Sequence, residues 1–175
     1  ARLSGLSLTF QRSGEGEEPV LYLNGTCVAE EIRSMAVASQ VSPIAALPFV
    51  RDFLTKEQQA MGQEKGIVMD GRDIGTAVFP KAEMKVFLTA DPKIRAERRL
   101  KELRAKGDEV TTLEEVLRNL EERDYIDTHR AVAPLKQAPD AVVLDNSFLS
   151  IREQDLMLRF AFEAVLAHLR TEKCV

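Results

Sequence analysis

Short apolar runs alternate with helical segments from residue 67 onward, and this alternation restricts the possible fold more than any other feature of the sequence. The runs are continuous in their apolar character, which is typical of strands that are buried on both sides. We expect three such strands, at residues 67–70, 84–90 and 141–145. Because helices intervene along the chain, the sequence predicts an α/β fold with a parallel sheet covered on both faces.

Capping signals mark the helices of this segment. Asp91 can cap a helix and Pro92 suits its first turn, so we expect a helix that runs to about Lys106. Two capping boxes, at 112–115 and 150–153, predict the start of a helix that reaches about residue 129 and the start of a terminal helix. The terminal helix carries an apolar stripe of Ile151, Leu156, Met157, Phe160, Val165 and Leu169.

The first 62 residues have a different character and predict a small α+β subdomain. Residues 6–12 alternate in polarity and indicate a strand, and 19–26 indicate a second strand that ends in an Asn-Gly turn. The polar segment 13–18 between them is expected to be a loop. Helices are expected at 30–42, where Pro43 should end or kink the helix, and from Pro48 to about Gly62.

Charge and hydropathy exclude several classes of protein. The net charge is −4 and the pI is about 5.4, whereas a protein that binds nucleic-acid polymers usually carries a basic field. No apolar run approaches the roughly 18 residues of a membrane helix. The first ten residues lack the pattern of a secretion signal. We therefore expect a cytoplasmic protein with no nucleic-acid polymer and no membrane as partner.

Cysteine and histidine are too few and too widely spaced for a typical metal site. Cys27 and Cys174 lie far apart in the sequence, and His129 and His168 do not supply zinc-ligand spacing with them. Because cytosolic disulfides are rare, reduced thiols are expected. The sequence therefore predicts no protein metal site.

The stretch VMDGRDIGTAVFP, residues 68–80, is the first candidate for a site. In parallel α/β sheets, ligands bind beyond the carboxyl ends of strands, and Asp70 to Asp73 follow such an end. Gly71 permits a sharp turn, Arg72 can grip a phosphate with its planar guanidinium group, and Asp73 can accept hydrogen bonds from an amino group. The alternative is a buried Arg–Asp pair that ties down a loop.

Residues 122–135, ERDYIDTHRAVAPL, hold a second group of charged side chains. Arg123, Asp127 and Arg130 are spaced by four and three residues, so on a helix they share one face. The alternative interpretation is an exposed Arg–Asp–Arg ladder, which contributes little to stability.

Two further segments carry weaker signals. Arg95, Arg98 and Arg99 lie in the first turns of a predicted helix, where the helix dipole disfavours positive charge, so an anion is expected nearby. The alternative is a solvated basic face that pairs with neighbouring glutamates. Ser39 and Arg51 lie on two helices joined by a bend, and neither is distinctive by itself.

Taken in order, the segments ASQVS…PFVRDFL, GIVMDGRDIGTAVFPKAEMKVFLTADPKIRAERR and ERDYIDTHRAVAPL…DAVVLD closely resemble the bacterial cytidylate kinases. The resemblance extends from about residue 20 to 170. It implies a P-loop nucleoside monophosphate kinase core with a parallel sheet, a small α+β monophosphate-binding insert and a helical lid. The implied boundaries are 1–62 for the insert, 63–90 and 131–175 for the core, and 91–130 for the lid.

The resemblance also implies a role for each candidate residue. Ser39, Arg51 and Asp73 match residues that recognise cytosine. Arg123 and Asp127 match residues that hold the ribose hydroxyls, and Arg72 and Arg130 match residues that hold the monophosphate. Of these, Arg72, Arg123 and Arg130 are expected to support catalysis. The lid arginines Arg95, Arg98 and Arg99 are expected to reach the donor phosphates, with Arg95 and Arg99 the favoured pair because they share one helix face.

The activity implied by the resemblance is transfer of the γ-phosphoryl group of ATP to CMP and dCMP, by a protein that is expected to be monomeric. Cytosine offers an exocyclic amino donor, for which Asp73 is a natural acceptor. Uracil presents a carbonyl there, and the lost hydrogen bond costs roughly 1–3 kcal/mol. The alternatives are a kinase that prefers UMP or AMP and a non-catalytic module that binds pyrimidine nucleotides.

The sequence departs from the family in one respect. The pattern G-x-x-x-x-G-K-S/T, whose backbone amides and lysine cradle the donor phosphates and whose hydroxyl helps to hold Mg²⁺, is absent. We therefore interpret the chain as truncated or processed, and expect it to bind ATP and Mg²⁺ poorly and to be inactive by itself. In the family, the strand before that loop lies between those represented here by 67–70 and 84–90. We expect a gap in the sheet, with the missing piece supplied separately or the chain rearranged or oligomerised.

Overall fold

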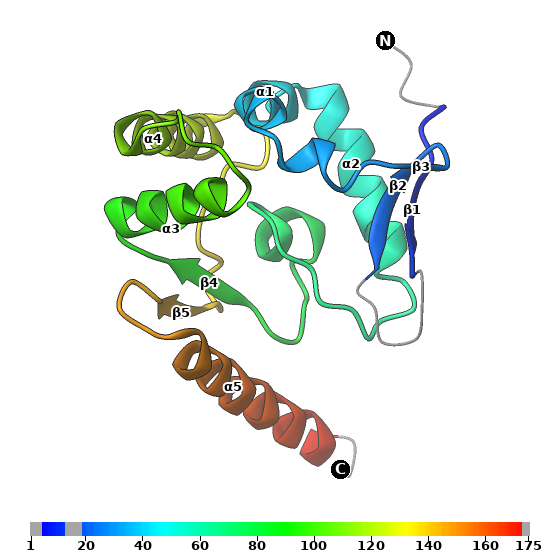
Figure 1. Ribbon diagram of the computed structural model, residues 1–175. Coiled ribbons are helices and arrows are strands. Elements are labelled where there is room, and N and C mark those ends of the chain that lie inside the picture. Colours follow the sequence, from blue (N-terminus) through cyan, green and yellow to red (C-terminus); the bar gives the residue numbers. More distant parts are fainter. Residues whose placement is uncertain (1–4, 13–18, 173–175) are drawn as a thin grey trace.

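The fold is described from a computed structural model, which covers residues 5–12 and 19–172 (Figure 1). The loop expected at 13–18 and Cys174 lie outside the described residues. Helices stack above a small parallel sheet, one long helix lies below it, and a separate antiparallel sheet stands at the side.

The antiparallel sheet confirms the two strands predicted in the first 30 residues. Strands β1 (Leu8–Gln11), β2 (Val20–Leu23) and β3 (Thr26–Cys27) are joined in that order. Leu8 pairs with Leu23, and Tyr22 pairs with Cys27. The Asn-Gly turn is confirmed because Asn24 and Gly25 both have positive φ, at 51° and 81°, as a tight hairpin turn requires.

The first long helix begins later and ends later than the sequence predicted. A short 3₁₀ segment, η1 (Glu31–Arg33), precedes α1 (Met35–Ala45), whose first turn is capped by the Ser34 hydroxyl. Pro43 does not end the helix. It lies in the last turn, and the amide of Ala46 donates to the carbonyl of Ser42 at 3.0 Å, which closes the turn beyond the proline. Helix α2 (Pro48–Met61) has the predicted bounds.

The parallel sheet contains two of the three predicted strands. Strands β4 (Val86–Thr89) and β5 (Val142–Asp145) pair in parallel, with Val86 opposite Val142. Residues 67–70 have no assigned secondary structure and form no ladder with any described strand. Val68 is 100 % exposed. The predicted strand is wrong here because an apolar run becomes a strand only where a neighbour takes its backbone hydrogen bonds.

The predicted helices of the second half are confirmed with their caps. Helix α3 (Pro92–Ala105) begins after Asp91, whose carboxylate accepts from two backbone amides. Helices α4 (Leu113–His129) and α5 (Ile151–Glu172) both begin with the predicted capping boxes. The buried core between α3 and α4 is formed by Ala96, Leu103 and Val116.

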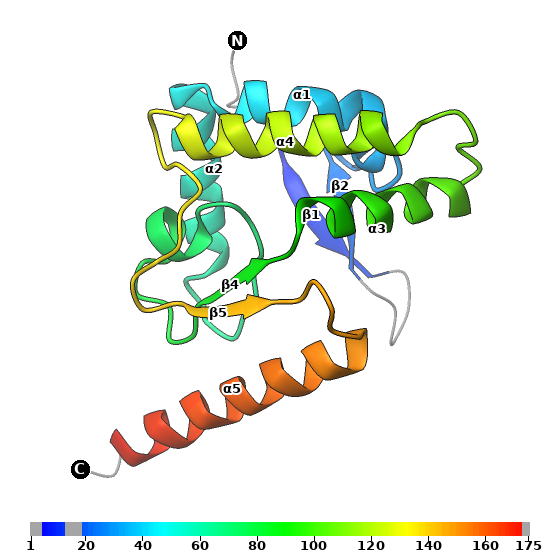
Figure 2. The same cartoon turned by 90° about the vertical axis from the view of Figure 1, so that its left-hand side faces the viewer.

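These elements form layers that place α4 at the centre of the upper part of the molecule. Figure 2 shows α4 lying along α1 and above α3, with β4 and β5 beneath α3. Helix α5 lies on the opposite side of the sheet. None of the described helices combines the length and the apolar character needed to cross a membrane.

Candidate functional site

The backbone around Asp73 forms an unusual turn that the sequence did not reveal. Residues Ile74–Val78 form η2, a single π-helical turn, and the carbonyl of Asp73 accepts from the amides of Ala77 and Val78 at 2.8 and 3.2 Å. At Gly71 a Cβ atom would lie 2.9 Å from the side chain of Ile74, so glycine is needed for this close approach. The turn points the carboxylate of Asp73 into the protein interior.

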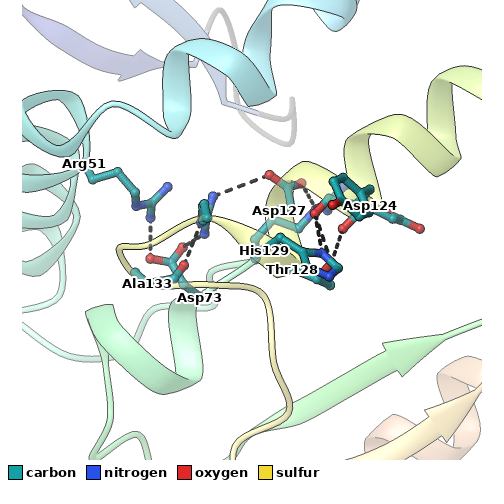
Figure 3. A network of polar contacts seen from close by, with 10 residues as sticks. Arg51, Asp73, Asp124, Asp127, Thr128, His129 and Ala133 are labelled. Atoms are coloured by element: carbon teal, nitrogen blue, oxygen red, sulfur yellow. Dashed lines mark hydrogen bonds and ion pairs between the residues drawn. The ribbon is translucent and has the colours of Figure 1, made fainter.

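Asp73 joins α2 to the segment after α4 through two guanidinium groups. Arg51 on α2 donates a hydrogen bond to Oδ2 of Asp73, and Nη2 of Arg130 lies 3.6 Å from Oδ1, as an ion pair. Figure 3 shows Arg51 and Asp73 facing each other. The exposed fractions are only 6 % for Arg51, 4 % for Asp73 and 8 % for Arg130. A buried charge of this kind is tolerated because its partners are charged as well.

Asp127 on α4 is the second buried carboxylate, with an exposed fraction of 3 %. Its Oδ2 accepts a hydrogen bond from Nε of Arg72 at 3.1 Å, and its Oδ1 lies 3.5 Å from Nη1 of Arg130. Arg130 therefore stands between Asp73 and Asp127. Nε of Arg130 donates to the carbonyl of Ala133 at 2.7 Å, where the backbone has the left-handed φ of 47°.

We call these five side chains, Arg51, Arg72, Asp73, Asp127 and Arg130, the arginine–aspartate network. With three guanidinium groups and two carboxylates, it carries one excess positive charge. Burial lowers the pKa of Arg130, and the neighbouring Arg51 lowers it further. The guanidinium group remains protonated at neutral pH, because an unperturbed arginine titrates far above that range.

Arg123 on α4 adds a further positive charge beside the network. Burial lowers the pKa of Arg123, the charge of Arg72 lowers it further, and Asp127 partly opposes this effect. Nε of Arg123 is buried and has no hydrogen-bond partner among the described residues. A hollow of about 320 Å³ adjoins this side chain and is also lined by Arg33, Arg99 and Asn119. A guanidinium group with one unpartnered N–H beside a hollow of this size suits the binding of an anion.

The three arginines Arg95, Arg98 and Arg99 of α3 do not converge on one point. Nη2 of Arg95 pairs with Asp124 at 2.7 Å, and Arg99 donates to Glu102 and to the carbonyl of Arg33 at 3.0 and 3.2 Å. Arg98 instead contacts the loop after β5. It donates to the side chain and carbonyl of Asn146 at 3.0 and 2.7 Å, and to the carbonyl of Ser147 at 3.2 Å.

Ser39 lies outside the arginine–aspartate network. Its hydroxyl is exposed and donates to the carbonyl of Ala36 at 2.9 Å, within α1. A second hollow, of about 400 Å³, opens beside Arg51 and Ala133. The contribution of Ala133 had no signal in the sequence, because alanine rarely adopts a positive φ.

The described residues do not supply a metal centre. They include no group of three or more histidine, cysteine, aspartate or glutamate side chains close enough to hold a metal ion. The carboxylates nearest the site, Asp73 and Asp127, are already paired with arginines.

Comparison with known proteins adds an independent observation to this geometry. The model of the family described as cytidylate kinase matches residues 3–158. The chain belongs to the cytidylate kinase family. The family expected from the three sequence segments is therefore confirmed, together with a mixed α/β fold that contains a parallel sheet.

Relatives within the cytidylate kinase family are highly similar over most of the chain. The cytidylate kinase of Porphyromonas gingivalis is 58 % identical over 163 residues, which cover 93 % of this chain and 71 % of that protein. The cytidylate kinase of Bacteroides thetaiotaomicron is 56 % identical over 161 residues, covering 92 % and 70 %. That of Flavobacterium johnsoniae is 49 % identical over 152 residues, covering 87 % and 66 %.

Proposed function

We propose that this member of the cytidylate kinase family transfers the γ-phosphoryl group of ATP to CMP and dCMP, giving CDP or dCDP and ADP. The observation that carries the proposal is the arginine–aspartate network, in which two buried carboxylates lie among three guanidinium groups from separate segments. The identity of 58 % to a cytidylate kinase supports the same substrate.

Asp73 is proposed to accept a hydrogen bond from the exocyclic amino group of cytosine. Its Oδ2 accepts from Arg51, which fixes the orientation of the carboxylate. Arg51 is proposed to donate to the ring nitrogen and the carbonyl of cytosine. Ser39 is proposed to contribute from α1, although it lies outside the network in this structure. Uracil has a carbonyl where cytosine has its amino group, so two acceptors would face each other at Asp73. We therefore expect CMP to be favoured over UMP by roughly 1–3 kcal/mol.

The sugar and phosphate are assigned to the other end of the network. Arg123 and Asp127 are proposed to hold the ribose hydroxyls, while Arg72 and Arg130 hold the monophosphate. The side chain of Arg72 is 43 % exposed and that of Arg130 only 2 % exposed, so Arg72 is the group that an incoming phosphate meets first. Together with Arg123, the network has the positive charge that a phosphate dianion requires.

Residues 91–130 are proposed to form the lid, residues 1–62 the monophosphate-binding insert, and residues 63–90 and 131–175 the core. Arg95 and Arg99 are proposed to reach the donor phosphates. Arg98 is held by Asn146 and Ser147, and this leaves it less free than the other two. ATP supplies the phosphoryl group. Mg²⁺ is proposed to bind mainly through ATP and a phosphate-binding loop.

We propose that this loop lies in a part of the protein outside the present sequence, since the pattern G-x-x-x-x-G-K-S/T is absent from it. Phosphoryl transfer depends on positioning and charge stabilisation, so the 175-residue chain is expected to bind CMP yet to transfer phosphate poorly. The absent pattern also favours a second candidate function, a non-catalytic module that binds pyrimidine nucleotides. We also predict that the protein is cytoplasmic and that its longer form is a monomer.

Calorimetry of the 175-residue chain with CMP, UMP, AMP and ATP tests this proposal. CMP should bind at least about fivefold more tightly than UMP, and ATP should bind weakly. Asp73→Asn should remove the preference for CMP, whereas Asp155→Asn, on exposed α5, should leave it unchanged. A coupled assay on a longer form of the protein, which includes the phosphate-binding loop, then distinguishes a kinase from a module that only binds nucleotides. Equal rates with CMP and UMP would contradict the role of Asp73.

A further inference from the structure

Lys85 carries a buried ammonium group to which the proposed nucleotide site assigns no role. Its side chain is only 7 % exposed, and it lies directly before β4. Nζ donates to the carbonyl of Pro80 at 2.6 Å and to the two carboxylate oxygens of Asp140 at 2.9 and 2.7 Å. The hydrogen bond from Lys85 lowers the pKa of Asp140. The three N–H groups of the ammonium thus have three acceptors, and the end of the side chain is fixed in place.

The aliphatic stem of Lys85 lies against the π-helical turn η2. Gly75 approaches the stem so closely that a Cβ atom on this glycine would lie 3.3 Å from Cδ and 3.5 Å from Cγ of Lys85. At such a distance either the stem or the turn must shift by a few tenths of an ångström. Because the stem is held by the backbone at one end and by the ammonium group at the other, the turn is the part that moves.

The turn η2 is also held from α2 and is hydrogen-bonded within itself. Nε2 of Gln59 on α2 donates to the carbonyl of Val78 at 3.2 Å. The carbonyl of Asp73, at the start of the turn, accepts from the amides of Ala77 and Val78 at 2.8 and 3.2 Å. This backbone is therefore one hydrogen-bonded unit, so a displacement at Gly75 is transmitted to Asp73.

We propose that Lys85 is a positioning residue for the recognition of cytosine, because it fixes the turn that presents the carboxylate of Asp73. The inference rests on the proposed function, in which Asp73 accepts a hydrogen bond from the amino group of cytosine. Such a bond has a narrow range of donor–acceptor distance, about 2.7–3.2 Å, so a small displacement of Asp73 weakens it. UMP has no amino group to donate, so Lys85 should affect the affinity for CMP alone.

A purely structural role for Lys85 makes a different prediction. Through Asp140, Lys85 links the start of β4 to the segment before β5, and loss of this link lowers the stability of the fold in either case. A structural role would weaken the binding of CMP and UMP equally, whereas positioning of Asp73 changes the ratio of the two affinities. This ratio is therefore the measurement that distinguishes the two roles.

Calorimetry of the 175-residue chain with CMP and with UMP tests the inference. Lys85→Met keeps the stem but removes the ammonium group, and it should weaken CMP binding at least about threefold while UMP binding is unchanged. Asp140→Ala should act in the same direction. It is the milder variant, because the side chain of Asp140 is 63 % exposed and its loss leaves the fold intact. Lys65→Met is the matched control, since Lys65 pairs with Glu83 on the surface and its side chain is 77 % exposed.

Gly75→Ala tests the close approach itself. In the wild-type background the added methyl group meets a fixed stem, and the preference for CMP should fall at least about twofold. In the Lys85→Met background the stem can move aside, so the same substitution should have no further effect on the ratio.

Circular dichroism identifies the variants that remain folded. An unchanged preference for CMP in folded Lys85→Met or Asp140→Ala, or an equal effect of Gly75→Ala in both backgrounds, would overturn the inference and leave the proposed function intact. A wild-type chain that binds CMP and UMP equally would instead refute the proposed function, and the inference with it.

Discussion

Arg130 is the residue on which the arginine–aspartate network depends, because it lies between the two buried carboxylates. Nε of Arg130 donates to the carbonyl of Ala133, and its terminal nitrogens face Asp73 and Asp127 at 3.6 and 3.5 Å. Removal of one partner leaves a buried charge unpaired, and this costs far more than the intact pair contributes. The stability of the fold and the geometry of the site are thus coupled at this side chain.

Asp127→Ala should destabilise the chain by about 3–5 kcal/mol, because it leaves the buried guanidinium group of Arg130 with one carboxylate instead of two. Urea denaturation followed by circular dichroism measures the change. Asp155→Ala is the control, since Asp155 forms an exposed pair with Arg159 on α5, and it should cost less than about 0.5 kcal/mol. Equal effects from the two variants would mean that burial of Asp127 does not matter.

At the scale of single elements, the capping boxes explain why α4 and α5 begin where they do. The Thr112 hydroxyl accepts from the amide of Glu115, and the carboxylate of Glu115 accepts from the amide of Thr112 at 2.8 Å. The hydrogen bonds that the Glu115 carboxylate accepts from the amide and the hydroxyl of Thr112 lower the pKa of Glu115 below its ordinary value of 4.5. The stabilisation is therefore complete above that value and is lost as the pH falls through the lowered pKa.

Thr112→Ala should cost about 1 kcal/mol at neutral pH, which is typical for loss of an N-cap. The difference from the wild-type chain should shrink as the pH falls below 4.5, because protonation of Glu115 weakens the same cap in the unmutated protein. Denaturation measured across this range checks both parts. A difference that is independent of pH would show that the two residues do not act together.

Arg98 connects the first turns of α3 to the loop that follows β5. Arg98→Ala should accelerate amide hydrogen exchange at residues 146–150, because the side chain and carbonyl of Asn146 and the carbonyl of Ser147 lose their donor. Arg99→Ala is the control, because Arg99 donates to Glu102 and to the carbonyl of Arg33 instead, and it should leave that exchange unchanged. Exchange followed by mass spectrometry measures both.

At the scale of the whole molecule, the candidate site joins α2, the turn after residue 70 and the end of α4. A ligand that contacts all three segments must stabilise them together. Saturation with CMP at one hundred times its Kd should therefore raise the stability by about 2.7 kcal/mol. A matching rise in Tm is expected with CMP and a smaller one with UMP. If CMP stabilised only one of the three segments, the result would argue against a shared site.

Local structure could be predicted from the sequence where the signal is local. The caps at Asp91, Thr112 and Ser150 and the turn at Asn24 are decided by neighbours within a few residues, and all are found where expected. The charge spacing predicted Arg123, Asp127 and Arg130 on one helix face, but α4 ends at His129 and Arg130 is its extended C-cap, from which it still lies 3.5 Å from Asp127. The π-helical turn after Asp73 and the backbone of Ala133 had no such signal.

The sequence by itself determined the helices, the turn, the parallel pair of β4 and β5, and the family to which the chain belongs. Only the tertiary structure decided that residues 67–70 remain unpaired, that Arg98 turns to the loop after β5, and that α5 leaves an apolar face uncovered. The reason is physical. Propensity and capping act over a few residues, whereas burial and pairing depend on which distant segments are present to make contact.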